Sequence, residues 1–321
     1  MTSIWKSGIM GVVIGDALGC PVQFKSRDIV EQDPIMCMVG HGTFNLPAGS
    51  WTDDSSLTLA TLESIQRVGK IDYMDIMENF IKWLDDGEFT PYGYAFDIGG
   101  MVRSALSKFK RIRDPMQCGG HYETDNGNGS LMRIMPAVLY CIDNQLPTEE
   151  AVEIIHKVGS LTHAHIRSNI ACGLYYFMAK SMLTESGTLM SRMQSGLDEG
   201  FAYYDDYMDQ LDVTFTEYIA QKQNITVYYR MRDLESFAAL PEDRIRSTGY
   251  VVDTLEAVVW ALATTDTFKE ALLKAVNLGY DSDTVGAVAG GLAGLYYGYN
   301  AIPEDWLAAI QRREWIEEML S

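Results

Sequence analysis

The sequence has few basic residues for its length. Its 25 Lys and Arg stand against 44 Asp and Glu, which gives a formal net charge of −19 over 321 residues. A surface with this excess repels phosphate backbones, so we expect no nucleic-acid partner. It also repels an anionic nucleotide at long range. A phosphate site in this chain would therefore need backbone N–H groups, an Arg or a metal ion.

Paired cysteines and long hydrophobic runs are also missing. The five cysteines are odd in number and form no CxxC motif, which favours reduced thiols over disulfides or a zinc framework. The apolar stretch at the N-terminus is interrupted by Asp16, and it has no signal-peptide cleavage pattern. We therefore expect a cytoplasmic protein without a membrane partner.

The strict alternation of apolar and polar residues that is typical of strands is almost absent, with one short stretch at 225–229. Apolar residues instead recur three and four positions apart, which predicts amphipathic helices and an all-α fold. The segments with this repeat are 57–68, 76–84, 101–109, 131–142, 149–158, 166–183, 250–264, 268–277, 284–298 and 303–319.

No internal repeat or low-complexity linker divides the chain, so residues 1–321 are predicted to form a single domain. Residues 186–247 are the least regular and are interpreted as a peripheral helical insertion or lid. Trp51 and Trp260 are expected in the core because aromatic residues on apolar stripes are usually buried.

The segment 284–298 is rich in glycine, with Gly286, Gly290 and Gly294 four residues apart. Each glycine in a helix costs roughly 1 kcal/mol relative to alanine, so this number requires a reason. The segment is too short and interrupted for a membrane span. We expect a buried helix whose backbone is approached closely by another helix or by a ligand.

Two acidic clusters precede helical segments, at residues 51–56 (Trp-Thr-Asp-Asp-Ser-Ser) and 279–284 (Gly-Tyr-Asp-Ser-Asp-Thr). Helix capping is the simpler interpretation of each, because Asp, Ser and Thr are favoured N-caps. One cap needs only one side chain, however, whereas each cluster has two carboxylates and a Thr hydroxyl. Such oxygen donors are typical ligands of Mg²⁺, Mn²⁺ or Ca²⁺. If the four acids converge in a partly buried site, their repulsion requires a cation, but spacing alone does not establish convergence.

Further candidates lie between the two clusters. Residues 126–130 (Asn-Gly-Asn-Gly-Ser) form a glycine-rich turn before a helix, which suits either a plain capped loop or a phosphate site with Arg133 one turn later. His163 and His165 form an HxH pair without a third ligand at a useful spacing, which favours hydrogen bonding over metal binding. Asp97 precedes Ile-Gly-Gly and could cap a helix.

Several of these motifs occur in one order along the chain, and the ordered set resembles the ADP-ribosylglycohydrolase family. The resemblance runs from residue 15 to about residue 298. The motifs are 15–19 (GDALG), 51–54 (WTDD), 96–99 (FDIG), 128–133 (NGSLMR), 162–163 (TH), 249–255 (GYVVDTL) and 281–286 (DSDTVG).

The resemblance implies an all-α, multi-helix orthogonal bundle with a metal-lined cleft and two divalent cations, Mg²⁺ or Mn²⁺. It implies a hydrolase that cleaves ADP-ribose from a modified protein or small-molecule conjugate, with a metal-bound water beside the ribose anomeric carbon. Carried over by position, the metal ligands would be Thr52, Asp53, Asp54, Asp281, Asp283 and Thr284.

The resemblance also assigns the remaining site residues. The segment of Asn128, Gly129, Ser130 and Arg133 would line the ADP-ribose cleft, and His163 would lie beside the phosphates. Tyr280 stands where the family usually has a small residue, and it would narrow the mouth or stack on the ligand. The residues with catalytic roles would be Asp53 and Asp54, Asp97 as an acid–base group facing the acceptor-linked ribose, and Gln23.

Gln23 is a departure from the family pattern, in which Glu often occupies this position and is thought to act as acid–base on serine-linked ADP-ribose. Gln cannot exchange a proton at neutral pH. An arginine-linked substrate departs as a guanidine and tolerates this change, and the net charge of −19 favours a cationic acceptor. We therefore predict hydrolysis of the N-glycosidic bond to arginine. The alternatives are O-linked or small-molecule conjugates, or a non-catalytic ADP-ribose-binding or structural protein on the same fold.

Overall fold

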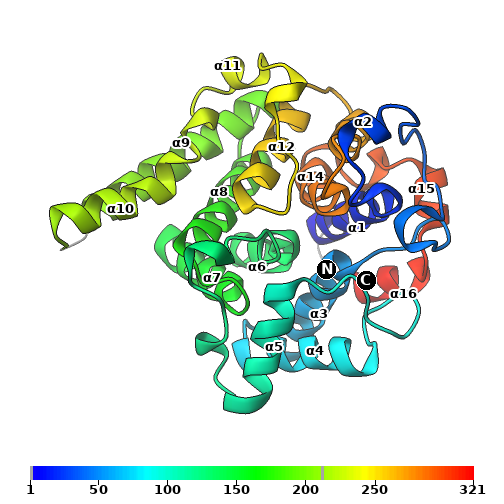
Figure 1. Ribbon diagram of the computed structural model, residues 1–321, viewed down its shortest axis with the longest axis horizontal. Helices are drawn as coiled ribbons and strands as arrows, with labels where there is room; N and C mark the ends of the chain where they lie inside the picture. The colour runs from blue at the N-terminus through cyan, green and yellow to red at the C-terminus, as the bar shows by residue number, and fades with distance from the viewer. Residues whose placement is uncertain (1–2, 211–212) are drawn as a thin grey trace.

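The computed structural model describes residues 3–210 and 213–321, and its regular structure is helical (Figure 1). Within these residues β-pairing is limited to isolated bridges, such as Gly127 with Tyr250. The predicted all-α fold is confirmed. The α-helices are α1 Ser3–Gly19, α2 Arg27–Val30, α3 Asp53–Val68, α4 Tyr73–Asp86, α5 Gly100–Ile112, α6 Met135–Asp143, α7 Thr148–Ser160, α8 Ile166–Thr184, α9 Leu189–Asp209, α10 Phe215–Thr226, α11 Leu234–Ala238, α12 Val251–Ala263, α13 Phe268–Val276, α14 Ser282–Tyr297, α15 Glu304–Ala309 and α16 Arg313–Met319.

Short 3₁₀-helices connect many of these elements. They are η1 Cys20–Val22, η2 Gly42–Phe44, η3 Pro115–Gln117, η4 Glu123–Asp125, η5 Leu131–Arg133, η6 Tyr229–Met231, η7 Glu242–Arg244 and η8 Tyr299–Ala301.

The helices α1 and α14 lie side by side at the centre of the molecule (Figure 1). Their backbones touch, because a Cβ atom added to Gly11 would lie 2.1 Å from the carbonyl oxygen of Gly290. A Cβ atom on Gly286 would lie 2.3 Å from the carbonyl oxygen of Gly15. The close approach predicted for residues 284–298 is confirmed, and the approaching element is α1.

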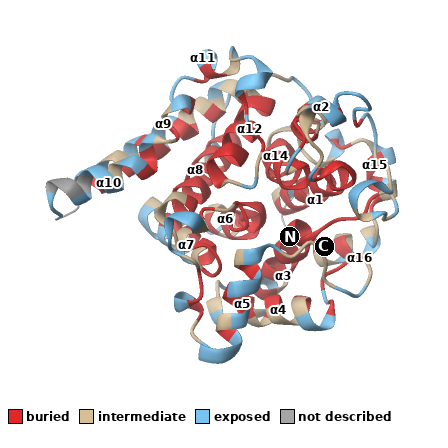
Figure 2. Cartoon of the chain, viewed as in Figure 1, coloured by how far each residue is buried: buried red, intermediate tan, exposed pale blue. Residues whose placement is uncertain are grey.

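The core surrounds this pair, with buried faces of α3, α6, α8 and α12 turned toward it (Figure 2). Trp51 and Trp260 are both buried, as predicted. Residues at the first turns of α3 and α14 are buried although many are polar. The core therefore encloses two helix N-termini, and these carry the acidic clusters.

The helices α9 and α10 project from the body as a hairpin (Figure 1). The short strand suggested for residues 225–229 is wrong, because α10 continues to Thr226 and a turn leads into η6. Ile225 and Tyr228 are both buried and are three residues apart, a spacing that places them on one side of a helical turn. Among the described residues, no helix combines the length and apolar character needed to span a membrane.

Candidate active site

The two acidic clusters stand at the N-termini of α3 and α14. Thr52 is the N-cap of α3, and its hydroxyl accepts a hydrogen bond from the backbone N–H of Asp54. Asp281 is the N-cap residue of α14, but its side chain makes no capping hydrogen bond. Capping therefore accounts for Thr52 and not for the carboxylates of the two clusters.

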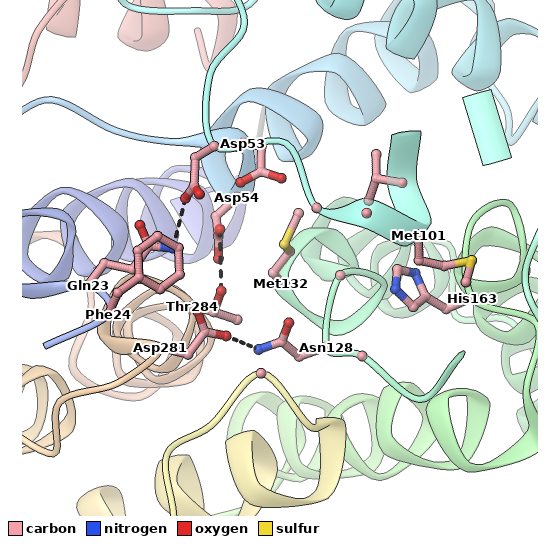
Figure 3. Close-up of a pocket in the computed structure, with 17 residues that line it drawn as sticks. Gln23, Phe24, Asp53, Asp54, Met101, Asn128, Met132, His163, Asp281 and Thr284 are labelled. Atoms are coloured by element: carbon pink, nitrogen blue, oxygen red, sulfur yellow. Dashed lines mark hydrogen bonds between the residues drawn. The ribbon is translucent and has the colours of Figure 1, made fainter. Parts of the chain in front are cut away.

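The two N-termini meet. The hydroxyl of Thr284 on α14 donates to Oδ2 of Asp54 on α3 over 3.4 Å (Figure 3). The Thr52 hydroxyl lies 3.2 Å from the same oxygen and 3.0 Å from Asp16 Oδ1. Asp53, Asp54 and Asp283 are at most 5% exposed. The convergence that spacing could not establish is thus present.

The buried carboxylates have few neighbouring groups that offset their negative charge or donate hydrogen bonds to them. Burial raises the pKa of Asp53, Asp54 and Asp283 well above its usual range, and neighbouring carboxylates raise each pKa further. Oδ1 of Asp54 and Oδ2 of Asp283 are buried without a hydrogen-bond partner. Oxygen donors with excess negative charge and unused lone pairs suit a hard divalent cation.

The side chains are not arranged as a finished metal centre. Within the described residues, no three His, Cys, Asp or Glu side chains already form a set with metal-ligand geometry. Unneutralised carboxylates repel one another, and a cation would draw their oxygens inward. The residues present therefore fit a cation of the Mg²⁺ or Mn²⁺ class.

Asp16 on α1 binds the first acidic cluster through hydrogen bonds. No role was predicted for this residue from the sequence. Its carboxylate accepts hydrogen bonds from the backbone N–H groups of Thr52 and Ser55, each at 3.0 Å, and from the Ser55 hydroxyl at 2.6 Å. Burial raises its pKa to about 7. Asp16 thereby fixes the first turn of α3. The sequence feature that could have indicated this role is a carboxylate within a largely apolar helical segment.

Gln23 and Asp97 form a pair beside the carboxylates. Gln23 Nε2 donates to Asp97 Oδ2 over 2.8 Å, while Gln23 Oε1 is buried without a partner. Asp97 has a φ of +52°, a left-handed conformation that is uncommon outside glycine. Burial raises the pKa of the Asp97 carboxyl. Asp97 can therefore hold a proton more readily than an ordinary aspartate.

The glycine-rich loop lies across the cavity from this pair. Asn128 Nδ2 donates to Asp281 Oδ2 and, over 2.9 Å, to Thr254 Oγ1, so it orients one of the acidic residues. Gly129 has to be glycine because a Cβ atom there would lie 2.7 Å from Cε1 of His163. The loop backbone and the His163 ring therefore form one wall.

His163 is neutral in this wall, because burial lowers its pKa to about 3. Its Nδ1 lies 2.9 Å from Thr162 Oγ1, and Arg133 donates to the same hydroxyl oxygen over 2.7 Å. Since a guanidinium only donates, Thr162 accepts from Arg133 and has its own O–H free for His163 Nδ1. This network assigns the ring proton to Nε2, which makes His163 an uncharged donor.

Many of these groups line a cavity of about 260 Å³ (Figure 3), whereas Asp16, Thr52 and Asp283 are buried and do not line it. His163 and Met101 lie at one end, Asn128 and Met132 follow, and the carboxylates precede Gln23 and Phe24 at the other end. The lining residues are Gln23, Phe24, Asp53, Asp54, Asp97, Gly99, Gly100, Met101, Val102, Gly127, Asn128, Gly129, Met132, His163, Gly249, Asp281 and Thr284.

Comparison with known proteins assigns this arrangement to a family. The family model described as ADP-ribosylglycohydrolase matches residues 5–321. The chain belongs to the ADP-ribosylglycohydrolase family.

Two relatives and one solved structure agree with this assignment. The ADP-ribosylarginine hydrolase Tri1 of Serratia proteamaculans is 29% identical over 98% of this chain and 77% of its own length. The ADP-ribosyl-[dinitrogen reductase] glycohydrolase of Rhodospirillum rubrum is 29% identical over 95% of this chain and 89% of its own length. A solved structure described as an ADP-ribosylglycohydrolase-related protein complex matches with a TM-score of 0.75 and 29% identity, covering 99% of this chain and 95% of that chain. The protein is thus an ADP-ribosylglycohydrolase.

Two predicted substrate contacts of this glycohydrolase need correction. Arg133 does not line the cavity, because its guanidinium is fully buried behind the loop, donates to the carbonyl oxygen of Val158 and packs over the ring of Phe80. Ser130 is also fully buried, with its hydroxyl 3.6 Å from Cys172 Sγ. Both side chains lie in the core and are not part of the cavity lining.

Tyr280 lies outside the main cavity of the glycohydrolase, in a neighbouring depression. It is 45% exposed, and its φ of +58° is left-handed. Its backbone N–H donates to the carbonyl oxygen of Lys25, and its carbonyl oxygen accepts from the N–H of Phe24. The lining residues Phe24, Met101 and Met132 were not singled out from the sequence, because isolated aromatic and Met residues resemble core positions.

Proposed function

We propose that this ADP-ribosylglycohydrolase cleaves the N-glycosidic bond between ADP-ribose and an arginine side chain, using two divalent cations, Mg²⁺ or Mn²⁺. The observation that carries the proposal is the meeting of two helix N-termini with buried carboxylates whose oxygens lack partners. Thr52, Asp53, Asp54, Asp281, Asp283 and Thr284 would hold the cations. Cations bound there would polarise the ribose hydroxyls, orient a water molecule and offset developing charge.

The protein's own groups would bind and orient the rest of the substrate. Gly127 and Gly129 line the cavity without side chains, so a phosphate group would have room to approach the loop backbone. His163 would add a neutral N–H donor, which recognises phosphate without a charge that depends on pH near neutrality. The diphosphate would thus lie at the loop end, and the ribose linked to the acceptor would lie beside the carboxylates.

The preference for arginine rests on Gln23, which cannot supply a proton to a leaving group. A guanidine leaves with its own N–H protons, whereas a serine alkoxide needs strong proton assistance. The similarity to an ADP-ribosylarginine hydrolase supports the same linkage.

A second candidate is the O-linked conjugate, and it is favoured by one observation. Asp97 has a raised pKa and lies within hydrogen-bond distance of Gln23, so it could supply the proton that Gln23 cannot.

Release of free ADP-ribose from two peptides that differ only in linkage separates these candidates. With Mg²⁺ or Mn²⁺ present, we expect faster release from ADP-ribosyl-arginine than from ADP-ribosyl-serine. Equal rates or faster release from serine would contradict the arginine preference and assign the proton to Asp97.

A further inference from the structure

Phe24 is an exposed aromatic residue at the edge of the catalytic cavity. Its side chain is 64% exposed, although it directly follows the buried Gln23. Its φ of +64° is left-handed, a conformation that costs a non-glycine residue of order 1 kcal/mol or more. Residues in such strained conformations cluster at active sites and ligand clamps, which points to a role for this ring at the cavity.

The ring is held in place despite its exposure. The backbone N–H of Phe24 donates to the carbonyl oxygen of Tyr280 over 2.5 Å. Its ring meets Phe44 edge-on with 6.2 Å between centroids, and Phe44 in turn meets Phe96 at 5.5 Å. Phe96 directly precedes Asp97, whose carboxylate is bonded to Gln23. The aromatic contacts and this hydrogen bond fix Phe24 relative to the Gln23–Asp97 pair.

Phe24 lies at the end of the cavity opposite to the groups that suit the ADP moiety. His163 and the glycine loop, which suit phosphate, are at the opposite end, and the carboxylates lie between (Figure 3). A bond cleaved at the carboxylates therefore has its nucleotide part toward His163. The group released from the anomeric carbon has to lie on the side of Phe24.

We propose that Phe24 is a specificity-determining residue of the acceptor subsite, whose ring face receives the guanidinium of the modified arginine; this inference rests on the proposed function. A guanidinium stacks on an aromatic face through cation–π attraction. The carboxylates of Asp97 and Asp281 line the same cavity, and the net charge of −19 favours a cationic group. The nearby cation Arg27 is occupied, since it donates to the carbonyl oxygens of Leu278, Glu242 and Ile245.

A preorganised ring makes this recognition efficient. Because the left-handed backbone and the contact with Phe44 already fix Phe24, little rotamer entropy is lost when a ligand stacks on it. A serine acceptor offers no planar cation to the ring. The subsite therefore discriminates between linkages independently of the proton chemistry at Gln23.

The test compares Phe24→Leu with Phe24→Trp. Both substitutions keep a Cβ atom at the same backbone position, but only Trp keeps an aromatic face. With an ADP-ribosyl-arginine peptide, we expect Phe24→Leu to raise KM about 5- to 20-fold, with kcat little changed, and Phe24→Trp to restore KM. The inhibition constant of free ADP-ribose and the KM of an ADP-ribosyl-serine peptide should stay within twofold of wild type. Tyr207→Leu, which removes an exposed ring on α9, is the matched control and should change nothing.

Each other outcome overturns the inference in a recognisable way. An unchanged KM for Phe24→Leu would show that the ring does not contact the acceptor. An equal loss of affinity for free ADP-ribose would place the ring against the nucleotide instead. If the wild-type enzyme releases no ADP-ribose from the arginine peptide, the proposed function itself fails and the inference fails with it.

Discussion

Asp283 has no exposed surface, and one of its oxygens has no hydrogen-bond partner. Asp283→Asn removes one buried negative charge but keeps an amide oxygen that can accept from the Thr284 backbone N–H. We expect turnover to fall at least about 100-fold and Mg²⁺ binding to weaken, because a cation ligand is lost. Without cations, the variant should melt no lower than wild type, because repulsion with Asp54 and Asp281 is relieved. Isothermal calorimetry with Mg²⁺ and thermal melting measure the two effects.

Glu256→Gln is the control for this substitution. Glu256 is also a buried carboxylate, but it lies on α12 and pairs with Arg230 over 2.6 Å. Its replacement should leave Mg²⁺ binding unchanged. Wild-type Mg²⁺ binding in Asp283→Asn would show that the acidic clusters are structural caps.

The proposed preference for arginine depends on Gln23. Gln23→Glu would place a second carboxyl within about 2.8 Å of Asp97, and two carboxyls so close share a proton. That proton is available to an alkoxide leaving group, so the serine-linked reaction should gain about 10²- to 10⁴-fold, the usual range for acid–base assistance. The arginine-linked reaction should gain less. Initial rates on both peptides give the comparison, and equal gains would remove Gln23 from the explanation of specificity.

Some single residues were predictable and others were not. The two acidic clusters were visible because carboxylates and hydroxyls repeat at helix starts, but their meeting needed the family resemblance, since spacing contains no tertiary distance. Arg133 was misplaced because its long side chain can point to either face of the loop. In the structure it turns inward, where backbone carbonyls and Thr162 accept its hydrogen bonds.

At the scale of helices, the contact between α1 and α14 places Asp16 and the N-terminus of α14 in one site. Gly11→Ala should be strongly destabilising, because its Cβ atom would overlap a backbone carbonyl, and backbone cannot move aside as a side chain can. We expect a loss of about 3 kcal/mol or more in the free energy of unfolding. Gly8→Ala on the same helix is the matched control, since its Cβ atom meets only side chains, the nearest being Leu295 at 3.0 Å. Urea unfolding compares the two, and equal stabilities would show that the helices can separate freely.

Long helices were easier to predict from the sequence than short irregular segments. The repeat at 166–183 corresponds closely to α8, Ile166–Thr184, because a buried helix repeats its apolar residues over several turns. Residues 225–229 are too few to reveal a period, and their apparent alternation is the end of α10 followed by a turn. The glycine spacing in 284–298 indicated close packing, but it could not indicate that α1 is the partner.

At the scale of the whole molecule, acid should weaken the attachment of α9 to the body. His156 on α7 lies 2.8 Å from the Tyr204 hydroxyl on α9, and burial lowers its pKa to about 4. The unfolded chain, with a His pKa of about 6.5, binds the proton first as pH falls. This contribution to stability is therefore complete above pH 6.5 and is lost progressively toward pH 4.

His156→Gln keeps a polar partner for Tyr204 but cannot become charged. Relative to this variant, wild type should lose about 2 kcal/mol of unfolding free energy between pH 7.5 and pH 4.5. Urea unfolding of both proteins at the two pH values gives this difference in unfolding free energy. The titration of all other groups cancels because it is the same in both proteins. Parallel stability profiles would contradict a neutral His156 in the folded protein.

The central claim is that buried carboxylates on α3 and α14 hold the cations that make this glycohydrolase active on arginine-linked ADP-ribose. Its most direct test is the rate of ADP-ribose release from an ADP-ribosyl-arginine peptide, measured after complete metal removal and again as Mg²⁺ or Mn²⁺ is returned. We predict no release from the metal-free enzyme and saturable recovery, with the cation concentration at half recovery matching the dissociation constant from calorimetry. Full activity in the metal-free enzyme, or none at any cation concentration, would contradict the account.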